Sequence, residues 1–260
     1  MRLDGAIAIV TGAGQGIGQH IALRLAQDGA LVCIVDINLD GLKETEEMIT
    51  KANAKKPAII LTDVSREGEV EPMVKEALKI ADRVDILVNN AGIMGPVKNV
   101  EDILVEEWEQ TMAVNLRGMF LCCKHVVPIM KRQKRGCIVN IASVTGKRPL
   151  TQRLPYATSK MGVIGLTRTL AAEVGEWNIR VNSVCPGAVE GSRLKKVFEG
   201  IMKYSGKTWD QVVSERLEST PLRRLIHPKD IAAVVAFLCS EDGAMITGED
   251  VNVSAGDVMF

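Results

Sequence analysis

The segment Ala6-Ile-Ala-Ile-Val-Thr-Gly-Ala-Gly-Gln-Gly-Ile-Gly18 joins a short apolar run to a turn that contains four glycines. The run from Ala6 to Thr11 is almost entirely apolar, which is typical of a strand buried on both faces of a parallel sheet. The residues from Ile17 to Gln27 carry apolar side chains at helical spacing and end before Gly29, a helix stop signal. The segment therefore predicts a buried strand, a glycine turn and a helix in succession.

The same alternation of strand and helix continues along the chain. Further strands are expected at 31–36, 58–61, 85–89, 137–142, 180–184 and 250–253. Helical spacing is found at 39–52, 67–81, 101–113, 116–131, 157–176 and 228–240. This order predicts an α/β fold of the Rossmann-like type, a doubly wound parallel sheet with helices on both faces. No linker is visible, so we expect a single domain over 1–260 with an insertion at about 190–220.

Composition excludes several kinds of partner. The chain has 260 residues with 32 basic and 32 acidic side chains, so neither nucleic acid nor an anionic membrane is expected as its main partner. No apolar run reaches the ~18 residues of a membrane span, and no signal-peptide pattern opens the sequence. The six cysteines lack metal-like spacing, which favours reduced, packed thiols in a cytoplasmic protein and no metal site.

The glycine turn has the properties of a phosphate-binding site. Glycines between a strand and a helix let the backbone approach a pyrophosphate, although such turns also occur without any ligand. Asp36 ends the next expected strand, 18 residues beyond Gly18, where a carboxylate can bind an adenosine ribose and repel the extra phosphate of NADP. Its neighbours Ile37 and Asn38 carry no positive charge. The alternative for Asp36 is a turn or helix cap, but the combination predicts NAD.

Four polar residues form a candidate catalytic set. Tyr156 and Lys160 are four residues apart and therefore share one face of a helix. A phenol has an unperturbed pKa of about 10, and a nearby ammonium favours its phenolate form. Ser143 follows the expected strand 137–142, where its hydroxyl can reach a substrate oxygen. Asn115 is expected in mid-helix, where a local bond from side chain to backbone is the common alternative.

Six ordered elements make the chain similar to the short-chain dehydrogenase/reductase family, from about residue 3 to 254. These are the turn Thr11–Gly18, the pair Asp63-Val64, the segment Asn89-Asn90-Ala91-Gly92, Asn115, the set Ser143, Tyr156 and Lys160, and Cys185-Pro186-Gly187. The resemblance implies that NAD is bound by Gly12, Gln15, Gly16, Ile17, Gly18, Asp36, Asp63, Val64, Asn90, Ala91, Gly92, Tyr156, Lys160, Pro186, Gly187 and Val189.

The resemblance also implies a role for each catalytic residue. Tyr156 would exchange a proton with the substrate oxygen, and Ser143 would polarise that oxygen. Lys160 would bind the nicotinamide ribose and lower the pKa of the tyrosine, while Asn115 would hold a water that links Lys160 to solvent. The expected reaction is an NAD-dependent interconversion of a secondary alcohol and a ketone by hydride transfer. The family implies a homotetramer that uses the helices at 116–131 and 157–176 and the last strand.

Three other functions are alternatives at this point. A 3-oxoacyl-thioester reductase of the same family would use NADPH, which Asp36 disfavours. A non-catalytic NAD-binding regulator would be expected to lose one of the catalytic residues, and none is lost. A sugar-nucleotide epimerase would need a different glycine pattern and a longer chain. Two departures from the family are Gly191, where threonine is common, and Ser254-Ala255-Gly256 in place of Asp-Gly-Gly.

The substrate is the least determined feature of the sequence. Cations flank the catalytic residues, and the candidate substrate contacts are Arg148, Arg153 and Ser192. An arginine that faces the pocket would bind a carboxylate, sulfonate or phosphate, whereas the alternative is a set of solvated or interface charges. A neutral polyol or cyclic alcohol is also compatible with a chain that contains only nine aromatic residues.

Overall fold

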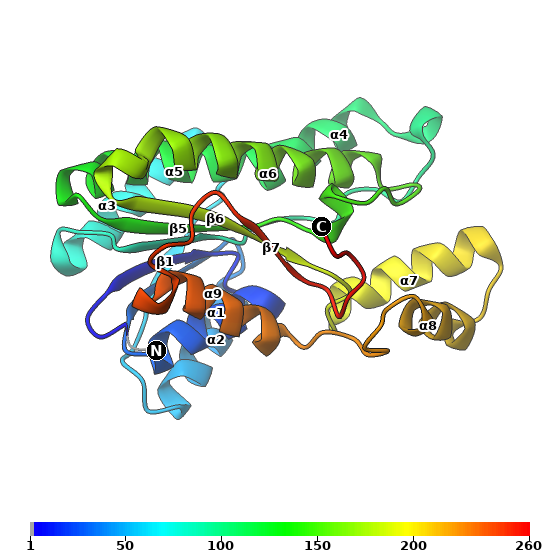
Figure 1. Cartoon of the computed structure of the whole chain (residues 1–260), viewed down its shortest axis with the longest axis horizontal. Helices are drawn as coiled ribbons and strands as arrows, with labels where there is room; N and C mark the ends of the chain where they lie inside the picture. The colour runs from blue at the N-terminus through cyan, green and yellow to red at the C-terminus, as the bar shows by residue number, and fades with distance from the viewer. Residues whose placement is uncertain (1–2) are drawn as a thin grey trace.

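Seven parallel strands form a single sheet in the computed structural model, which describes residues 3–260 (Figure 1). The order across the sheet is β3-β2-β1-β4-β5-β6-β7. The strands are β1 (Ile7–Thr11), β2 (Leu31–Asp36), β3 (Ala58–Leu61), β4 (Ile86–Asn89), β5 (Gly136–Ile141), β6 (Ile179–Pro186) and β7 (Asp250–Val253). The predicted doubly wound parallel sheet is thus confirmed, and its order reverses between β1 and β4.

Helices cover both faces of this sheet (Figure 1). One layer consists of α1 (Gly16–Gln27), α2 (Leu39–Lys51) and α9 (Pro228–Cys239). The other consists of α3 (Glu67–Ala81), α4 (Val105–Met112), α5 (Gly118–Gln133) and α6 (Leu154–Val174). Two further helices, α7 (Ser192–Ser205) and α8 (Trp209–Glu218), project beyond the end of the sheet where β6 leads out.

The apolar core consists of one layer on each side of the sheet. Successive side chains of a strand point to opposite faces, so a strand covered on both sides is apolar throughout. Ile9 and its register partner Leu87 pack in the layer under α3 and α5. The next pair, Val10 and Val88, packs in the layer under α1 and α9. All four side chains are fully buried, which explains the uninterrupted apolar run of β1.

The helices around the catalytic residues differ from the expected ranges. The helix predicted at 157–176 begins earlier, at Leu154, because Pro155 is well suited to a first helical turn. The helix predicted at 101–113 is shorter and is followed by a π-helical turn over Ala113–Arg117. The insertion expected at about 190–220 contains α7 and α8.

Two expectations from composition can be compared with the structure. None of the helices described between residues 3 and 260 is long and apolar enough to cross a bilayer. The six cysteines are free thiols and all are buried. They therefore pack as small apolar side chains, as the sequence predicts.

Candidate active site

A cavity of about 680 Å³ opens at the carboxyl ends of the strands. It extends from Asp36 at the end of β2, past the glycine turn after β1, to Ser143 after β5 and Pro186 at the end of β6. The cavity therefore spans the point between β1 and β4 where the strand order reverses. In open α/β sheets, ligands bind at such a switch point.

The glycine turn is held in place by a side chain from the neighbouring strand. Gly12 adopts a φ of 65°, and a Cβ atom there would lie 2.7 Å from Cα of Ala91, so no larger residue fits. Asn90 follows β4, and its Nδ2 donates to the carbonyl oxygens of both Thr11 and Gly12 at 2.9 Å. The turn thus presents the amino end of α1 to the cavity.

The carboxylate of Asp36 forms the turn hydrogen bonds that the sequence allows, and it also lines the cavity. Its Oδ2 accepts a 2.9 Å hydrogen bond from the Gly14 backbone, and its Oδ1 accepts one of 3.0 Å from the Asn38 backbone. The half-buried carboxylate also lines the cavity, next to the exposed side chain of Ile37. It therefore supports the glycine turn and offers a negative charge to a ligand.

Ser143, Tyr156 and Lys160 all line the cavity. Ser143 follows β5, and its Oγ accepts a 3.1 Å hydrogen bond from the Thr145 backbone. Tyr156 lies in the first turn of α6, and Lys160 follows one turn later. The ammonium of Lys160 lies 5.7 Å from the centre of the Tyr156 ring. The predicted catalytic set therefore contains a hydroxyl, a phenol and an amine from two adjacent elements.

The environment of Lys160 makes it easy to deprotonate. The residue is 3% exposed, and its Nζ donates a 2.7 Å hydrogen bond to the carbonyl oxygen of Ile141. Burial, and then the positive charge of Arg193, lower the pKa of Lys160 to about 7. Near neutral pH this buried amine is therefore able to gain or lose a proton, a property that is common at functional sites.

Asn115 lies behind the cavity wall, in the π-helical turn. Its Oδ1 accepts a 2.7 Å bond from the Ile93 backbone, and its Nδ2 donates to the Ile93 carbonyl and to Oγ of Ser159. Ser159 in turn donates to the carbonyl oxygen of Tyr156 at 2.7 Å. Asn115 thus connects the segment after β4 to the turn that carries the tyrosine, and π-helical turns often occur at functional sites.

The cations near the cavity differ in how their charge is balanced. Lys147 is turned away, since it forms an ion pair with Asp250 in β7. Arg148 lines the cavity, but its Nη1 lies 2.8 Å from Oδ1 of Asp257. Arg216 of α8 binds the other oxygen of Asp257 at 2.5 Å. Arg216 and Asp257 were not predicted, because partners separated by 41 residues leave no local pattern in the sequence.

Two other arginines line the cavity, and neither forms an ion pair with a carboxylate of residues 3–260. Arg153 precedes α6 and is 5% exposed, and its guanidinium carbon lies 4.7 Å from the centre of the Tyr156 ring. Arg193 of α7 is exposed, and its Nη2 donates to the carbonyl oxygen of Gly92 at 2.6 Å. Ser192 lines the cavity at the start of α7 and follows Gly191, whose φ of 136° would be strained for threonine.

Most residues predicted to bind the cofactor line this one cavity. They are Gly12, Gln15, Gly16, Ile17, Asp36, Asp63, Val64, Asn90, Ala91, Gly92, Tyr156, Lys160, Pro186, Gly187 and Val189. Gly18 is the exception, because it is buried inside the first turn of α1. The predicted cofactor residues come from six separate segments of the sequence, and all of them except Gly18 line one cavity.

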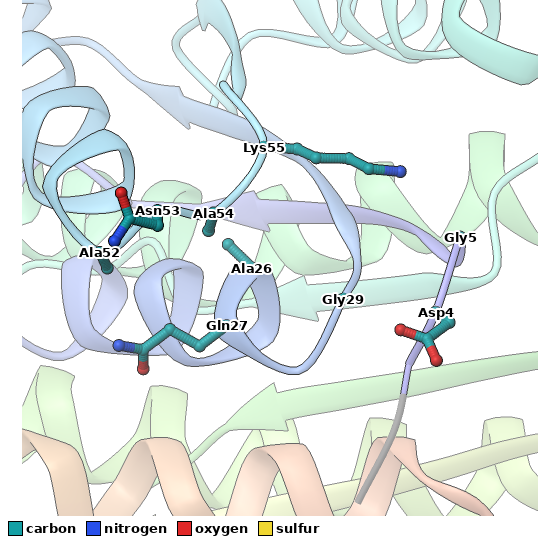
Figure 2. Close-up of a pocket in the computed structure, with 9 residues that line it drawn as sticks. All are labelled: Asp4, Gly5, Ala26, Gln27, Gly29, Ala52, Asn53, Ala54 and Lys55. Atoms are coloured by element: carbon teal, nitrogen blue, oxygen red, sulfur yellow. The ribbon is translucent and has the colours of Figure 1, made fainter.

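A second hollow, of about 330 Å³, lies at the amino ends of the strands, opposite the first cavity (Figure 2). It is lined by Gly5, Gly29 and Lys55, which precede the amino ends of β1, β2 and β3, together with Asp4 and Asn53. In Figure 2 its longer side chains do not converge on a common point. None of the predicted catalytic or cofactor residues lies here.

The fold and the cavity together define a class of protein, the dinucleotide-dependent oxidoreductases with a tyrosine and a lysine on one helix face. Residues 12–257 match a family model described as enoyl-(acyl carrier protein) reductase. The chain belongs to the short-chain dehydrogenase/reductase family of oxidoreductases.

Individual relatives differ in substrate and cofactor. The chain is 36% identical to a 3-oxoacyl-(acyl-carrier-protein) reductase of Thermotoga maritima, over 100% of both chains. It resembles the structure of an NAD⁺-bound xylitol dehydrogenase with a TM-score of 0.95 and 31% identity, over 98% of this chain and 100% of the other. It also resembles an actinorhodin polyketide ketoreductase with NADPH, with a TM-score of 0.95 and 32% identity over 100% of both chains. Solved relatives therefore bind NAD⁺ or NADPH.

Proposed function

We propose that this protein is an NAD-dependent oxidoreductase that interconverts a secondary alcohol and a ketone, with Tyr156 as its acid/base group. The observation that carries the proposal is that Ser143, Tyr156 and Lys160 line the same cavity as the glycine turn and Asp36. When bound, NAD supplies the acceptor for the hydride of the alcohol carbon.

Residues of the chain transfer the proton and position the substrate oxygen. Tyr156 removes the hydroxyl proton during oxidation and returns it during reduction. Ser143, whose Oγ is held by the Thr145 backbone, donates a hydrogen bond to the same substrate oxygen. Lys160 favours the phenolate through its positive charge and, with a pKa of about 7, is able to pass on the proton. Asn115 fixes the turn that carries Tyr156, and in this proposal it also holds a water that leads to solvent.

The preference for NAD over NADP rests on the carboxylate of Asp36. This carboxylate lines the cavity at the end of β2, where an adenosine ribose is expected. The neighbouring Ile37 and Asn38, which also line the cavity, carry no positive charge to balance the 2′-phosphate of NADP. Repulsion between the carboxylate and that phosphate favours NAD.

A 3-oxoacyl-thioester reductase is the second candidate. It is favoured by the relative from Thermotoga maritima, which is 36% identical over the full length. Asp36 argues against NADPH as its cofactor. A non-catalytic NAD-binding regulator is disfavoured, because the chain has retained every side chain that the chemistry needs.

A panel of substrates and cofactors separates these candidates. The assay follows the absorbance of the reduced cofactor. Secondary alcohols are tested with NAD and NADP, and ketones and 3-oxoacyl thioesters are tested with NADH and NADPH. The proposal expects turnover of alcohols and ketones, with NAD as the better cofactor. Turnover confined to the thioester with NADPH would favour the second candidate, and no turnover of any pair would contradict both.

We propose further that the protein acts as a homotetramer in the cytoplasm. Phe120 on α5 is 50% exposed and Met161 on α6 is 53% exposed, and such apolar surface on two neighbouring helices is suited to a subunit contact. Sedimentation analysis of the wild-type protein and of a Phe120→Glu, Met161→Glu variant tests the contact. The variant is expected to dissociate into smaller species.

A further inference from the structure

Arg153 is a buried cation placed directly beside the proposed acid/base group. The residue is 5% exposed, and its guanidinium carbon lies 4.7 Å from the centre of the Tyr156 ring. Its Nη2 donates a 3.0 Å hydrogen bond to the carbonyl oxygen of Met94. Arg153 lines the cavity together with Ser143 and Lys160, so the residue borders the space next to the reacting group.

Within residues 3–260, Arg153 has no carboxylate partner, although the adjacent Tyr156 favours its charged form. Among residues 3–260, no carboxylate lies within 4.0 Å of its guanidinium, and its buried Nε has no hydrogen-bond partner. Other cations around the cavity differ in this respect, since Arg148 and Arg216 share the carboxylate of Asp257. A buried charge without a partner is costly, and arginine stays charged at any working pH. The cost is offset when a ligand brings the missing negative charge.

Neighbouring groups make this part of the cavity more positive. Burial lowers the pKa of Arg153, Tyr156 partly counteracts this shift, and the positive charge of Arg193 lowers the pKa further. Burial and then Arg193 also lower the pKa of Lys160. The phosphates of a dinucleotide do not meet this need, because they are expected at the glycine turn after β1. Arg153 instead precedes α6, and its guanidinium contacts the Tyr156 ring and the carbonyl oxygen of Met94 in the segment after β4, not the glycine turn.

We propose that the substrate carries a carboxylate or sulfonate group, and that Arg153 binds this group while Tyr156 acts on the alcohol or ketone of the same molecule. The fork of an arginine is well matched to two oxygens of such an anion. The anionic group and the reacting carbon lie close together in this compound, because the guanidinium lies against the ring of the tyrosine whose hydroxyl meets the reacting oxygen. This inference rests on the proposed function and assigns the substrate class for the same site.

Matched pairs of charged and neutral ketones test this assignment. The probes are 2-oxobutanoate, 3-oxobutanoate and 4-oxopentanoate, the methyl ester of each, 2-oxopropane-1-sulfonate, and the neutral ketones butan-2-one and cyclohexanone, all with NADH. The wild-type enzyme is expected to reduce at least one anion with a higher kcat/KM than the matching neutral compound. Comparison of the acids with the sulfonate shows which anion the site takes.

Variants of two arginines then identify the group responsible. Arg153→Met is expected to lower kcat/KM for the preferred anion by ~10–100-fold more than it lowers kcat/KM for the neutral partner. Arg153→Lys keeps the positive charge but lacks the guanidinium fork, so its kcat/KM for the anion is expected to fall less than that of Arg153→Met. It replaces the methionine variant in the comparison if that variant folds poorly. Arg148→Met, which alters a cation already paired with Asp257, is expected to affect both members of a pair equally.

The outcomes separate this inference from the proposed reaction. Reduction of neutral ketones without any preference for an anion would overturn the anion site and leave the proposed reaction intact. An equal loss for both members of a pair in Arg153→Met would also overturn it, since the residue would then act through Tyr156 or through the structure of the site and not through the anion. Failure to reduce any of these ketones with either cofactor would overturn the proposed reaction and this inference with it.

Discussion

The ammonium of Lys160 lies 5.7 Å from the centre of the Tyr156 ring, one helical turn away on the same face of α6. The same ammonium donates a 2.7 Å hydrogen bond to the Ile141 carbonyl oxygen at the end of β5. Lys160 is therefore fixed between the sheet and the tyrosine at a buried position. This placement supports the chemistry, and it has a cost for the stability of the fold.

Replacing Lys160 by methionine should stabilise the protein at neutral pH while it reduces activity. In the folded protein burial lowers the pKa of Lys160 to about 7, whereas in the unfolded chain the amine stays protonated up to about pH 10. Between these values the unfolded state binds more protons, so stability is lowest near pH 7 and rises towards pH 10. Lys160→Met lacks this penalty, which is on the order of 1–4 kcal/mol.

Urea unfolding of both proteins between pH 7 and 10 measures this effect. The variant is expected to be the more stable at pH 7, and the difference should shrink as the pH rises. A constant difference across this range would show that Lys160 is protonated in the folded protein throughout. The rate of ketone reduction by the variant is expected to fall by ~10²-fold or more.

Asp36 should determine the choice of cofactor. Replacing Asp36 by alanine and the exposed Ile37 by arginine removes the repulsion of the extra phosphate and adds a cation beside it. The ratio of kcat/KM for NAD to that for NADP is expected to fall by ~10²-fold, which corresponds to a few kcal/mol.

Asp36→Asn serves as the control for the structural role of this residue. It removes the charge but retains an oxygen for the hydrogen bond from Gly14. Its ratio of kcat/KM for NAD to that for NADP is therefore expected to lie between the ratios of the wild type and the double variant. If the unmodified enzyme used both cofactors equally well, Asp36 would not have the role assigned to it.

Asn115 should matter for stability as well as for activity. Asn115→Ala leaves the N–H and the carbonyl of Ile93 without their partner, and a buried polar group left unsatisfied costs about 1–3 kcal/mol. Ser159→Ala removes only one of the bonds of Asn115 and should cost less. Urea unfolding measures the free energy of unfolding of the two variants and of the wild type. An Asn115→Ala protein as stable as the wild type would contradict the structural role of Asn115.

The pairing of Asp257 with two arginines should hold the tail of the chain to α8. The Asp257 side chain is fully buried, and Asp257→Asn leaves Arg148 and Arg216 without a balancing charge. Because both arginines keep some contact with solvent, a loss of about 1–3 kcal/mol in the free energy of unfolding is expected. Glu199→Gln, an exposed change on α7, is the control. Equal unfolding midpoints for the two variants would contradict a stabilising role.

The sheet and the central site were predictable because each depends on short-range patterns. The apolar run of β1 and the glycines that follow it specify a strand, a turn and a helix, and a separation of four residues aligns Tyr156 with Lys160. The π-helical turn around Asn115 was not predicted, because helical spacing around it looks regular. The ion pairs of Asp257 were not predicted either, because they join residues 41 and 109 positions apart.

The most direct test of the central claim compares Tyr156→Phe with Tyr204→Phe, a change of the only other tyrosine in the chain. Tyr204 lies on α7, is 48% exposed and does not line the cavity. Tyr156→Phe is expected to lower kcat by ~10²–10⁴-fold with NADH binding and the unfolding midpoint unchanged, while Tyr204→Phe keeps the wild-type rate. A Tyr156→Phe enzyme that retained most of the wild-type kcat would contradict the assignment of this tyrosine as the acid/base group.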